Sequence, residues 1–224
     1  DVSWRDYVAF GMPTEQMSGV AHLTGYENES PLFTGTTGGD IYAGVVGTHI
    51  LLAALQERRL TSKGQHINLS QMEAFNLFVG DAMTGWSMAG VDPERVGNRH
   101  SLFAPQGIYP CQDNRWIGIS CKTDEDWHEL ANLIDPQLAG KFPDVVSRQT
   151  PELDDIVGKW TQTRHAATLM SQLQALQIPA GVVQNGPDLL SDPQLLARNS
   201  FFVQDRPGLG EKHYPAQPYR FCNA

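Results

Sequence analysis

Cysteine is scarce in this 224-residue chain, which has three cysteines and no Cys-x-x-Cys pair. A disulfide framework needs an even number of cysteines, and a cysteine-ligated zinc site needs closely spaced pairs. The sequence therefore argues against a small domain stabilised by disulfides and against one stabilised by a cysteine-ligated zinc ion. Because free thiols are typical of reducing compartments, we expect a cytoplasmic protein.

Positive charge is also scarce, since the chain has 16 Lys and Arg but 25 Asp and Glu, which gives a net charge of −9. A field of this sign repels phosphates, so we expect no general binding to nucleic acid or to an anionic membrane. A local basic pocket for one phosphorylated ligand remains compatible with this charge. The longest apolar run, 41–55, is interrupted by Thr48 and His49 and is shorter than the ~20 residues that cross a bilayer. We therefore predict no membrane span, and a core helix buried on most of its faces.

Several short motifs that indicate a particular catalytic or binding chemistry are missing from the sequence. It contains no GxxxxGK[ST] phosphate loop, no HExxH, no GxSxG and no EF-hand loop. No two histidines are spaced i, i+4, so no helical face offers a histidine pair for a metal. We predict that no metal is bound.

Hydrophobic periodicity and turn residues predict an α/β protein in three parts, residues 1–103, 104–184 and 185–224. The first part is expected to contain a helix over 13–23, a loop over 24–39, a long helix opening at Asp40, a strand over 64–69 and a helix opened by a capping box at Ser70. From 104 to 184, short strands and amphipathic helices have the composition of a small separate α/β module. The last part predicts a helix over 193–198, a strand over 201–205 and a Pro/Gly-rich tail.

Asp40, which follows Gly38 and Gly39, is the most promising chemical group of the sequence. One interpretation is that Asp40 only caps the helix, because Asp is a preferred N-cap residue. A helix N-terminus also favours the ionised carboxylate, and ionisation is what a carboxylate nucleophile needs. The two glycines would leave space for a bulky acyl group. The two interpretations are compatible.

A few other polar residues are candidates for ligand contact. His49 lies within the apolar helix, where it is either a satisfied core group or part of a pocket. His100 follows Gly97 and Asn98 in a polar loop, where it could contact a ligand. A small basic cluster is either solvated or binds a ligand phosphate; it consists of Arg58, Arg59 and Lys63.

Taken in order, several segments resemble the class III CoA-transferases, the family of formyl-CoA:oxalate CoA-transferase and of the carnitine CoA-transferases. The matching stretches are SGVAHLTGY, GGDIYAGVVGTHILLAALQERRLTSKGQHINLSQMEA, VGNRHSLFAPQGIYPCQDNRWIGI and PAGVVQNGPDLLSDPQLLARNSFF, and the resemblance spans residues 13–221. Each stretch is weak alone, whereas their order and spacing together are specific. The family also includes α-methylacyl-CoA racemases.

This resemblance implies a fold and an assembly. A Rossmann-like segment would precede this region, so we expect the chain to be the central and later part of the large family domain plus the small α/β module. Two complete chains would interlock as a homodimer. Because the preceding segment supplies much of the family's CoA pocket, we expect the chain alone to be inactive. The family's glycine-rich lid falls near Gly97, where this sequence has no run of glycines.

The resemblance also implies a reaction, in which Asp40 is the catalytic aspartate. It would exchange CoA between an acyl-CoA and a carboxylic acid through an aspartyl-CoA thioester. Gly38, Gly39, Gly97, Asn98 and His100 would bind substrate, and no metal or permanently bound cofactor would take part. One alternative is a racemase, which moves a proton at the carbon next to the thioester. A second alternative is a non-catalytic structural fragment.

Overall fold

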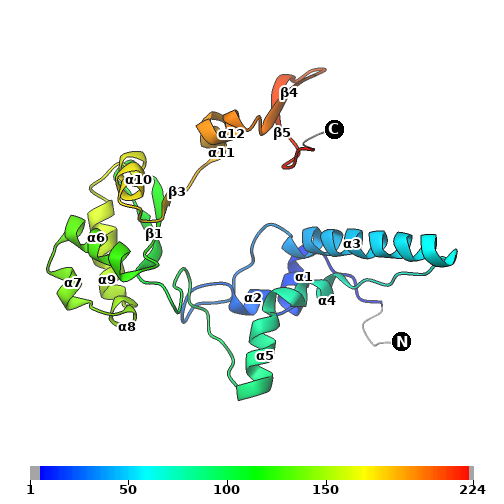
Figure 1. The fold of residues 1–224 in the computed structure, drawn as a ribbon, viewed down its shortest axis with the longest axis horizontal. Helices are drawn as coiled ribbons and strands as arrows, with labels where there is room; N and C mark the ends of the chain where they lie inside the picture. Colours follow the sequence, from blue (N-terminus) through cyan, green and yellow to red (C-terminus); the bar gives the residue numbers. More distant parts are fainter. Residues whose placement is uncertain (1–5, 222–224) are drawn as a thin grey trace. The chain divides into compact units, whose positions relative to one another are not determined.

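The computed structural model describes residues 6–221 (Figure 1). The chain divides into two compact units, Asp1–His100 and Ser101–Ala224. The strands that the structure describes all lie in the second unit. Each unit is described by itself below.

The first unit is built from helices, of which α3 is the longest. Their bounds are α1 Gly11–Met17, α2 Val20–Leu23, α3 Gly38–Thr61, α4 Gln71–Asn76, the 3-10 turn η1 Leu77–Val79 and α5 Gly80–Ala89. Both α1 and α4 pack against α3. This arrangement brings segments from three places in the sequence to the start of α3.

Two expectations for this unit are wrong. The helix expected over 13–23 is divided into α1 and α2 at Gly19, whose φ of 88° lies in the left-handed region. A left-handed residue interrupts the helical hydrogen bonds, and glycine adopts it without strain. The strand expected over 64–69 is irregular chain. Within residues 6–221 no strand pairs with this segment, so it lacks ladder hydrogen bonds.

The helix α3 also differs from expectation at its start. It begins at Gly38, with Thr37 in the N-cap position, so that Asp40 is the third helical residue and not the cap. Thr37 has a φ of 51° and its side chain makes no capping hydrogen bond. The helix ends at Thr61, before a left-handed Ser62. Asp40 therefore lies inside the first turn, where a carboxylate still interacts favourably with the helix dipole.

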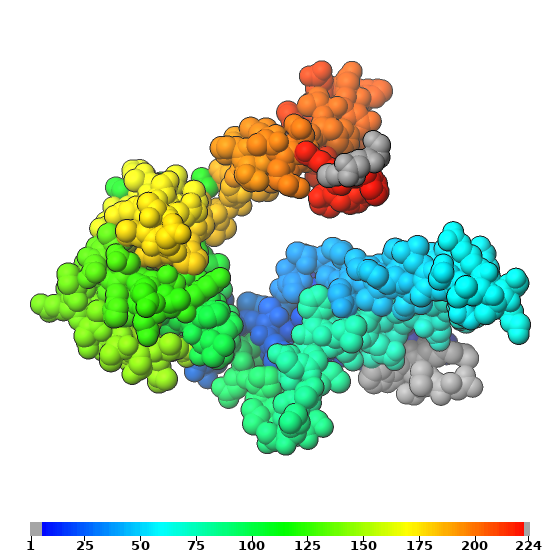
Figure 2. All heavy atoms as spheres, in the orientation of Figure 1, coloured from blue at the N-terminus to red at the C-terminus, as the bar shows by residue number. Residues whose placement is uncertain are grey.

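The burial expected for α3 is not found in this chain. Gly39 and Ala43 are its buried residues, whereas Ile41 is 64% and Leu52 is 60% exposed. Figure 2 shows its side chains, coloured blue to cyan, forming much of the surface of the first unit. With 24 residues, α3 is longer than the apolar run 41–55 and could cross a membrane by length and composition alone. A core helix of a globular enzyme passes the same test.

The second unit opens with the expected α/β module. Its antiparallel sheet has the order β1–β2–β3, with Ile108 opposite Gly118 and Ile117 opposite Val182. The elements are β1 Gln106–Pro110, β2 Trp116–Ser120, α6 Asp124–Ile134, α7 Leu138–Lys141, α8 Val145–Arg148, α9 Pro151–Thr161, α10 Ala166–Ala175 and β3 Ala180–Val182. The strands and helices predicted here are confirmed.

One hydrophobic core holds this module together. Ile117 and Ile119 point inward from β2, two residues apart as one face of a strand requires. Trp127 and Leu130 of α6 are fully buried against the same core. Burial of Cys121, together with the charge of Asp126, raises the pKa of this thiol to about 12 although Arg148 opposes the shift. Cys121 is therefore a neutral core residue at physiological pH.

The rest of the second unit contains more structure than the sequence predicts. Helices α11 Gly186–Ser191 and α12 Pro193–Ala197 are followed by the hairpin of β4 Phe201–Arg206 and β5 Gly210–Pro215. The Pro/Gly-rich tail, for which no strand was predicted, supplies β5. Its two glycines, Gly208 and Gly210, have φ values of 78° and 67° and make the turn of the hairpin.

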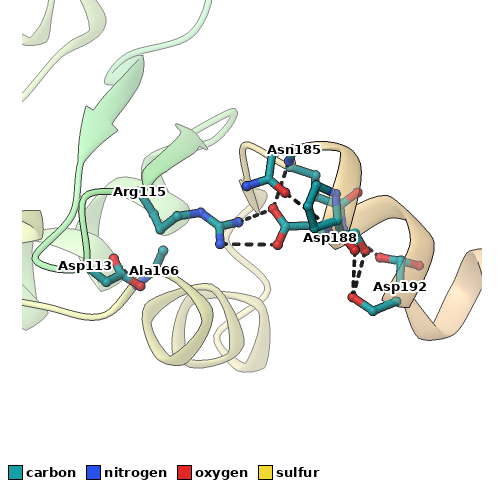
Figure 3. A network of polar contacts seen from close by, with 9 residues as sticks. Asp113, Arg115, Ala166, Asn185, Asp188 and Asp192 are labelled. Carbon is teal, nitrogen blue, oxygen red and sulfur yellow. Dashed lines mark hydrogen bonds and ion pairs between the residues drawn. The ribbon is translucent and has the colours of Figure 1, made fainter.

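An ion pair joins α11 to the α/β module (Figure 3). The guanidinium of Arg115, from the turn between β1 and β2, donates to both carboxylate oxygens of Asp188 at 2.6 and 3.3 Å. Asp188 also accepts the N–H of Asn185, whose side chain caps α11 in return. One carboxylate therefore both starts α11 and attaches it to the module.

Candidate active site

The Asp40 carboxylate lies exposed in the first turn of α3. The backbone N–H of Asp40 donates to Thr37 O at 3.0 Å. Its Oδ1 accepts a hydrogen bond from the Gln71 side-chain amide, with 3.1 Å between Nε2 and Oδ1. Among the residues described, Oδ2 accepts no hydrogen bond. The hydrogen bond from Gln71 therefore distinguishes the two carboxylate oxygens.

Gly38 and Gly39 have a packing role that the sequence interpretation did not include. A Cβ on Gly38 would lie 3.2 Å from Cζ of Phe75, and one on Gly39 would lie 3.3 Å from Cδ1 of the same ring. Phe75, on α4, is buried. The glycines therefore permit close packing of α3 on α4, and the space they leave is filled by this ring. Their binding of substrate stays a prediction.

Gly11 contacts the site, although the sequence analysis did not select it. It is the first residue of α1, and a Cβ there would lie 2.6 Å from Thr37 Cβ and 2.9 Å from Asp40 Oδ2. A side chain at this position would displace either the cap of α3 or the carboxylate. The available signal was a glycine two residues before Pro13, at a helix start.

Glu15 is the second residue that sequence reasoning missed. Its side chain is fully buried, and its carboxylate accepts three hydrogen bonds: from Thr34 N–H at 2.8 Å, Thr34 Oγ1 at 2.6 Å and Gly38 N–H at 3.1 Å. Since Thr37 provides no side-chain cap, Glu15 caps α3 from a different helix. Burial raises the pKa of Glu15, but the hydrogen bonds from Thr34 and Gly38 outweigh it and hold the pKa below its ordinary value. Glu15 is therefore an ionised anchor for the turn before Asp40.

The loop that contains the other predicted binding residues is anchored elsewhere. Gly97 has a φ of 60°, its N–H donates to Gly25 O at 2.9 Å, and a Cβ there would lie 2.7 Å from the Tyr26 ring. Asn98 is half-buried and His100 is exposed. The contacts of Gly97 thus go to the loop after α2, and the binding role of these three residues stays a prediction.

The remaining candidates lie along α3 and after it. His49 is exposed, with Nδ1 2.8 Å from Val45 O, so the interpretation as a core group is wrong for this chain. The basic cluster of Arg58, Arg59 and Lys63 is exposed. In the part of the chain that the structure describes, no group of three or more His, Cys, Asp or Glu could hold a metal ion.

The whole sequence, residues 1–224, matches the profile of CoA-transferase family III. The chain belongs to this family. It is 30% identical over 214 residues to the succinyl-CoA–D-citramalate CoA-transferase of Chloroflexus aurantiacus, covering 93% of this chain and 53% of that protein. It is 28% identical over 207 residues to the succinyl-CoA:mesaconate CoA-transferase of Haloarcula hispanica, covering 91% and 52%.

A solved structure shares the fold. The structure of a CAIB/BAIF family protein from Brucella suis matches with a TM-score of 0.87 and 24% identity, over 100% of this chain and 59% of that one. The mixed helix and sheet architecture expected from the sequence is therefore that of the family. The chain spans about half the length of the curated relatives it matches.

Proposed function

We propose that this chain carries the nucleophile of a CoA-transferase that moves coenzyme A from an acyl-CoA donor to a carboxylic acid acceptor. The observation that supports this most is the family match over the whole sequence, which includes an exposed carboxylate, Asp40, in the first turn of α3. An ionised carboxylate at this position is stabilised by the helix dipole and remains able to attack a thioester.

The proposed reaction proceeds through two covalent species on Asp40. The carboxylate attacks the thioester carbon of the donor, the C–S bond breaks and CoA leaves as a thiolate, which gives a mixed anhydride. The thiolate then attacks the Asp40 carbonyl carbon and expels the donor acid as a carboxylate, which gives an aspartyl-CoA thioester. The acceptor carboxylate repeats the two steps in reverse order and regenerates Asp40. The sequence of steps needs no oxidant, no net proton transfer and no ATP.

The relatives suggest substrates for a first test. Both curated relatives are named for succinyl-CoA as donor, one with mesaconate and one with D-citramalate as acceptor. We propose succinyl-CoA as the first donor to examine, with these two acids as first acceptors. The cytoplasmic location and the interlocked homodimer belong to the same proposal.

The racemase alternative is not favoured, because the relatives carry CoA-transferase names. It is still separable by experiment. Incubating the natural protein that contains this chain with one acyl-CoA in D₂O and no acceptor acid should give no deuterium at the carbon next to the thioester. Deuterium incorporation without acyl exchange would favour the racemase.

Asp40→Asn tests the nucleophile. Asn can keep a polar contact with Gln71 but has no anionic oxygen, so transfer should be abolished in the natural protein. The loss of a favourable charge in the first turn costs about 0.3–1 kcal/mol, so the fold should survive. Transfer assays with succinyl-CoA, together with a urea unfolding curve, check both statements.

The covalent species provides an independent measurement. During turnover, hydroxylamine should trap the activated Asp40 carbonyl, and peptide mass spectrometry should place the adduct on this residue. An Asp40→Asn variant that is folded and within about threefold of the parent in rate would remove the nucleophile assignment. An adduct found on a different residue would do the same.

A further inference from the structure

We propose that Gln71 is a catalytic residue of this site, whose side-chain amide stabilises the negative charge that develops on Asp40 Oδ1 when the Asp40 carbonyl carbon is attacked. This proposal rests on the proposed function. The observation behind it is the hydrogen bond from Gln71 Nε2 to Asp40 Oδ1, at 3.1 Å. This is an ordinary hydrogen-bond length, and it places the donor beside the oxygen that would carry the charge in the tetrahedral species.

The position of the Gln71 amide is set by packing, although its side chain is exposed. Gln71 is the first residue of α4, and the Ser70 side chain caps that helix by accepting the N–H of Glu73 at 3.3 Å. Phe75 follows Gln71 by four residues, so both lie on the same face of α4. The buried ring of Phe75 fixes this face against the glycines at the start of α3. The core contact thus places Gln71 beside Asp40.

The two oxygens of Asp40 would then have different roles. Among the described residues Oδ2 accepts no hydrogen bond, so no donor competes for its lone pairs when it attacks the donor thioester. In that step the negative charge develops on the oxygen of the substrate, which Gln71 does not contact. Once Oδ2 bridges to the acyl group, Oδ1 is the carbonyl oxygen of the anhydride and still faces the amide.

The charge moves to Oδ1 in the next two steps. When the CoA thiolate adds to the Asp40 carbonyl carbon, the C–S bond forms and the carbonyl electron pair shifts to Oδ1; collapse expels the donor carboxylate with the bridging oxygen. When the acceptor carboxylate adds to the thioester, the pair shifts to Oδ1 again and the thiolate leaves. Gln71 N–H donates to Oδ1 in both tetrahedral species, in which the bond is stronger than in the neutral carbonyl.

The test is Gln71→Leu in the natural protein, since Leu has a similar size and no donor. We expect kcat to fall by about 100-fold or more, as for removal of one oxyanion donor. KM for the acyl-CoA should fall together with kcat, because an intermediate that forms at the parent rate accumulates when the following step is slowed. Gln162→Leu, an exposed residue of the second unit, is the matched control and should retain the parent rate.

A rapid-quench experiment separates catalysis from mere positioning of Asp40. With acyl-CoA alone, Gln71→Leu should release one equivalent of free CoA per site at the parent rate and then accumulate the mixed anhydride. If Gln71 only holds Asp40 in place, this first step will slow by the same factor as turnover, and the proposal is wrong.

Steady-state rates separate this proposal from the function on which it depends. A folded Gln71→Leu with kcat within about threefold of an active parent would overturn the proposal while leaving Asp40 as the nucleophile. A parent that shows no transfer, or an active Asp40→Asn, would overturn the proposed function itself and this inference with it.

Discussion

Glu15 is a buried carboxylate that binds the backbone of Gly38, two residues before the proposed nucleophile Asp40. Its carboxylate accepts the N–H of Gly38 and two hydrogen bonds from Thr34. In Glu15→Gln, the amide NH₂ would face these donors, leaving at least one buried N–H unpaired. We expect a loss of about 1–3 kcal/mol in the free energy of unfolding, measured by urea titration of the natural protein.

A matched control for this change is Glu57→Gln, an exposed residue of α3. Because it lies on the surface, its unfolding free energy should stay within about 0.5 kcal/mol of the parent. Equal effects of the two changes would contradict the anchoring role of Glu15.

The same residue predicts a pH dependence. The pKa of Glu15 is held below its ordinary value of 4.5 in the folded chain, so the carboxylate stabilises the fold fully above that value. The contribution should be lost as the pH falls through the lower folded pKa. The stability difference between parent and Glu15→Gln should therefore be constant from about pH 7 to 5.5 and shrink below about pH 4.5. A stability difference between parent and Glu15→Gln that grows as the pH falls would contradict the lowered pKa of Glu15.

At the scale of elements, the link between α11 and the α/β module depends on one fork-shaped contact. Arg115 donates through two nitrogens to Asp188, and a lysine would donate from a single point. Because both side chains are partly exposed, Arg115→Lys should cost only about 0.5 kcal/mol of global stability. The local effect should be larger, and amide hydrogen exchange in 186–191 should be faster.

Arg198→Lys, an exposed position after α12, controls for the loss of a guanidinium in this region. It should leave exchange in α11 unchanged. If Arg115→Lys also leaves it unchanged, the capping box of Asn185 and Asp188 alone holds this helix, and the ion pair contributes nothing to it.

At the scale of the whole molecule, we expect the 224-residue chain by itself to lack transferase activity. CoA carries a diphosphate and a 3′-phosphate, which need several cationic or N–H partners. The chain has a net charge of −9 and no phosphate-binding glycine loop. Without an anchored nucleotide, the binding energy that would position the thioester at Asp40 is lost. Calorimetric titration with CoA should show no binding, and acyl exchange should be absent.

Exposed apolar side chains add a second readout for the isolated chain. They come from α3 and α5 and include Ile41, Leu52, Leu60, Trp86 and Met88. Surfaces of this kind associate in water, so sedimentation should show oligomers of the chain. If the isolated chain is a monomer that binds CoA at micromolar concentration and catalyses acyl exchange, residues 1–224 contain a complete active site and this prediction is wrong.

Much of the α/β module could be predicted from the sequence because its signals are local. Thr123 and Thr150 both cap helices by accepting an N–H three residues later, and Thr123 forms a full capping box. Leu153, Val157 and Trp160 repeat at helical spacing and are buried. The caps and the apolar spacing both lie within a single helix and its flanking residue, so they can be recognised in the sequence.

The order of the matching segments likewise identified the family from the sequence, and the profile match confirms it. Asp40 could be selected as a candidate nucleophile because a glycine pair and an apolar helix flank it in the sequence. The packing around its two glycine neighbours is not visible in the sequence, and their binding of substrate stays a prediction. Gly38 and Gly39 were interpreted as space for substrate, whereas the ring of Phe75 occupies that space.

The sequence by itself therefore determined the family, the local helices and strands of the module, and Asp40 as the candidate nucleophile. Only the tertiary structure decided which groups surround Asp40: Glu15 binds Gly38 across 23 residues, and Gln71 binds Asp40 across 31. The side chain of Glu15 resembles any other helical carboxylate until folding places α1 beside α3. Hydrogen bonds of this kind depend on the packing of distant helices, and no local propensity or periodicity records which helices will meet.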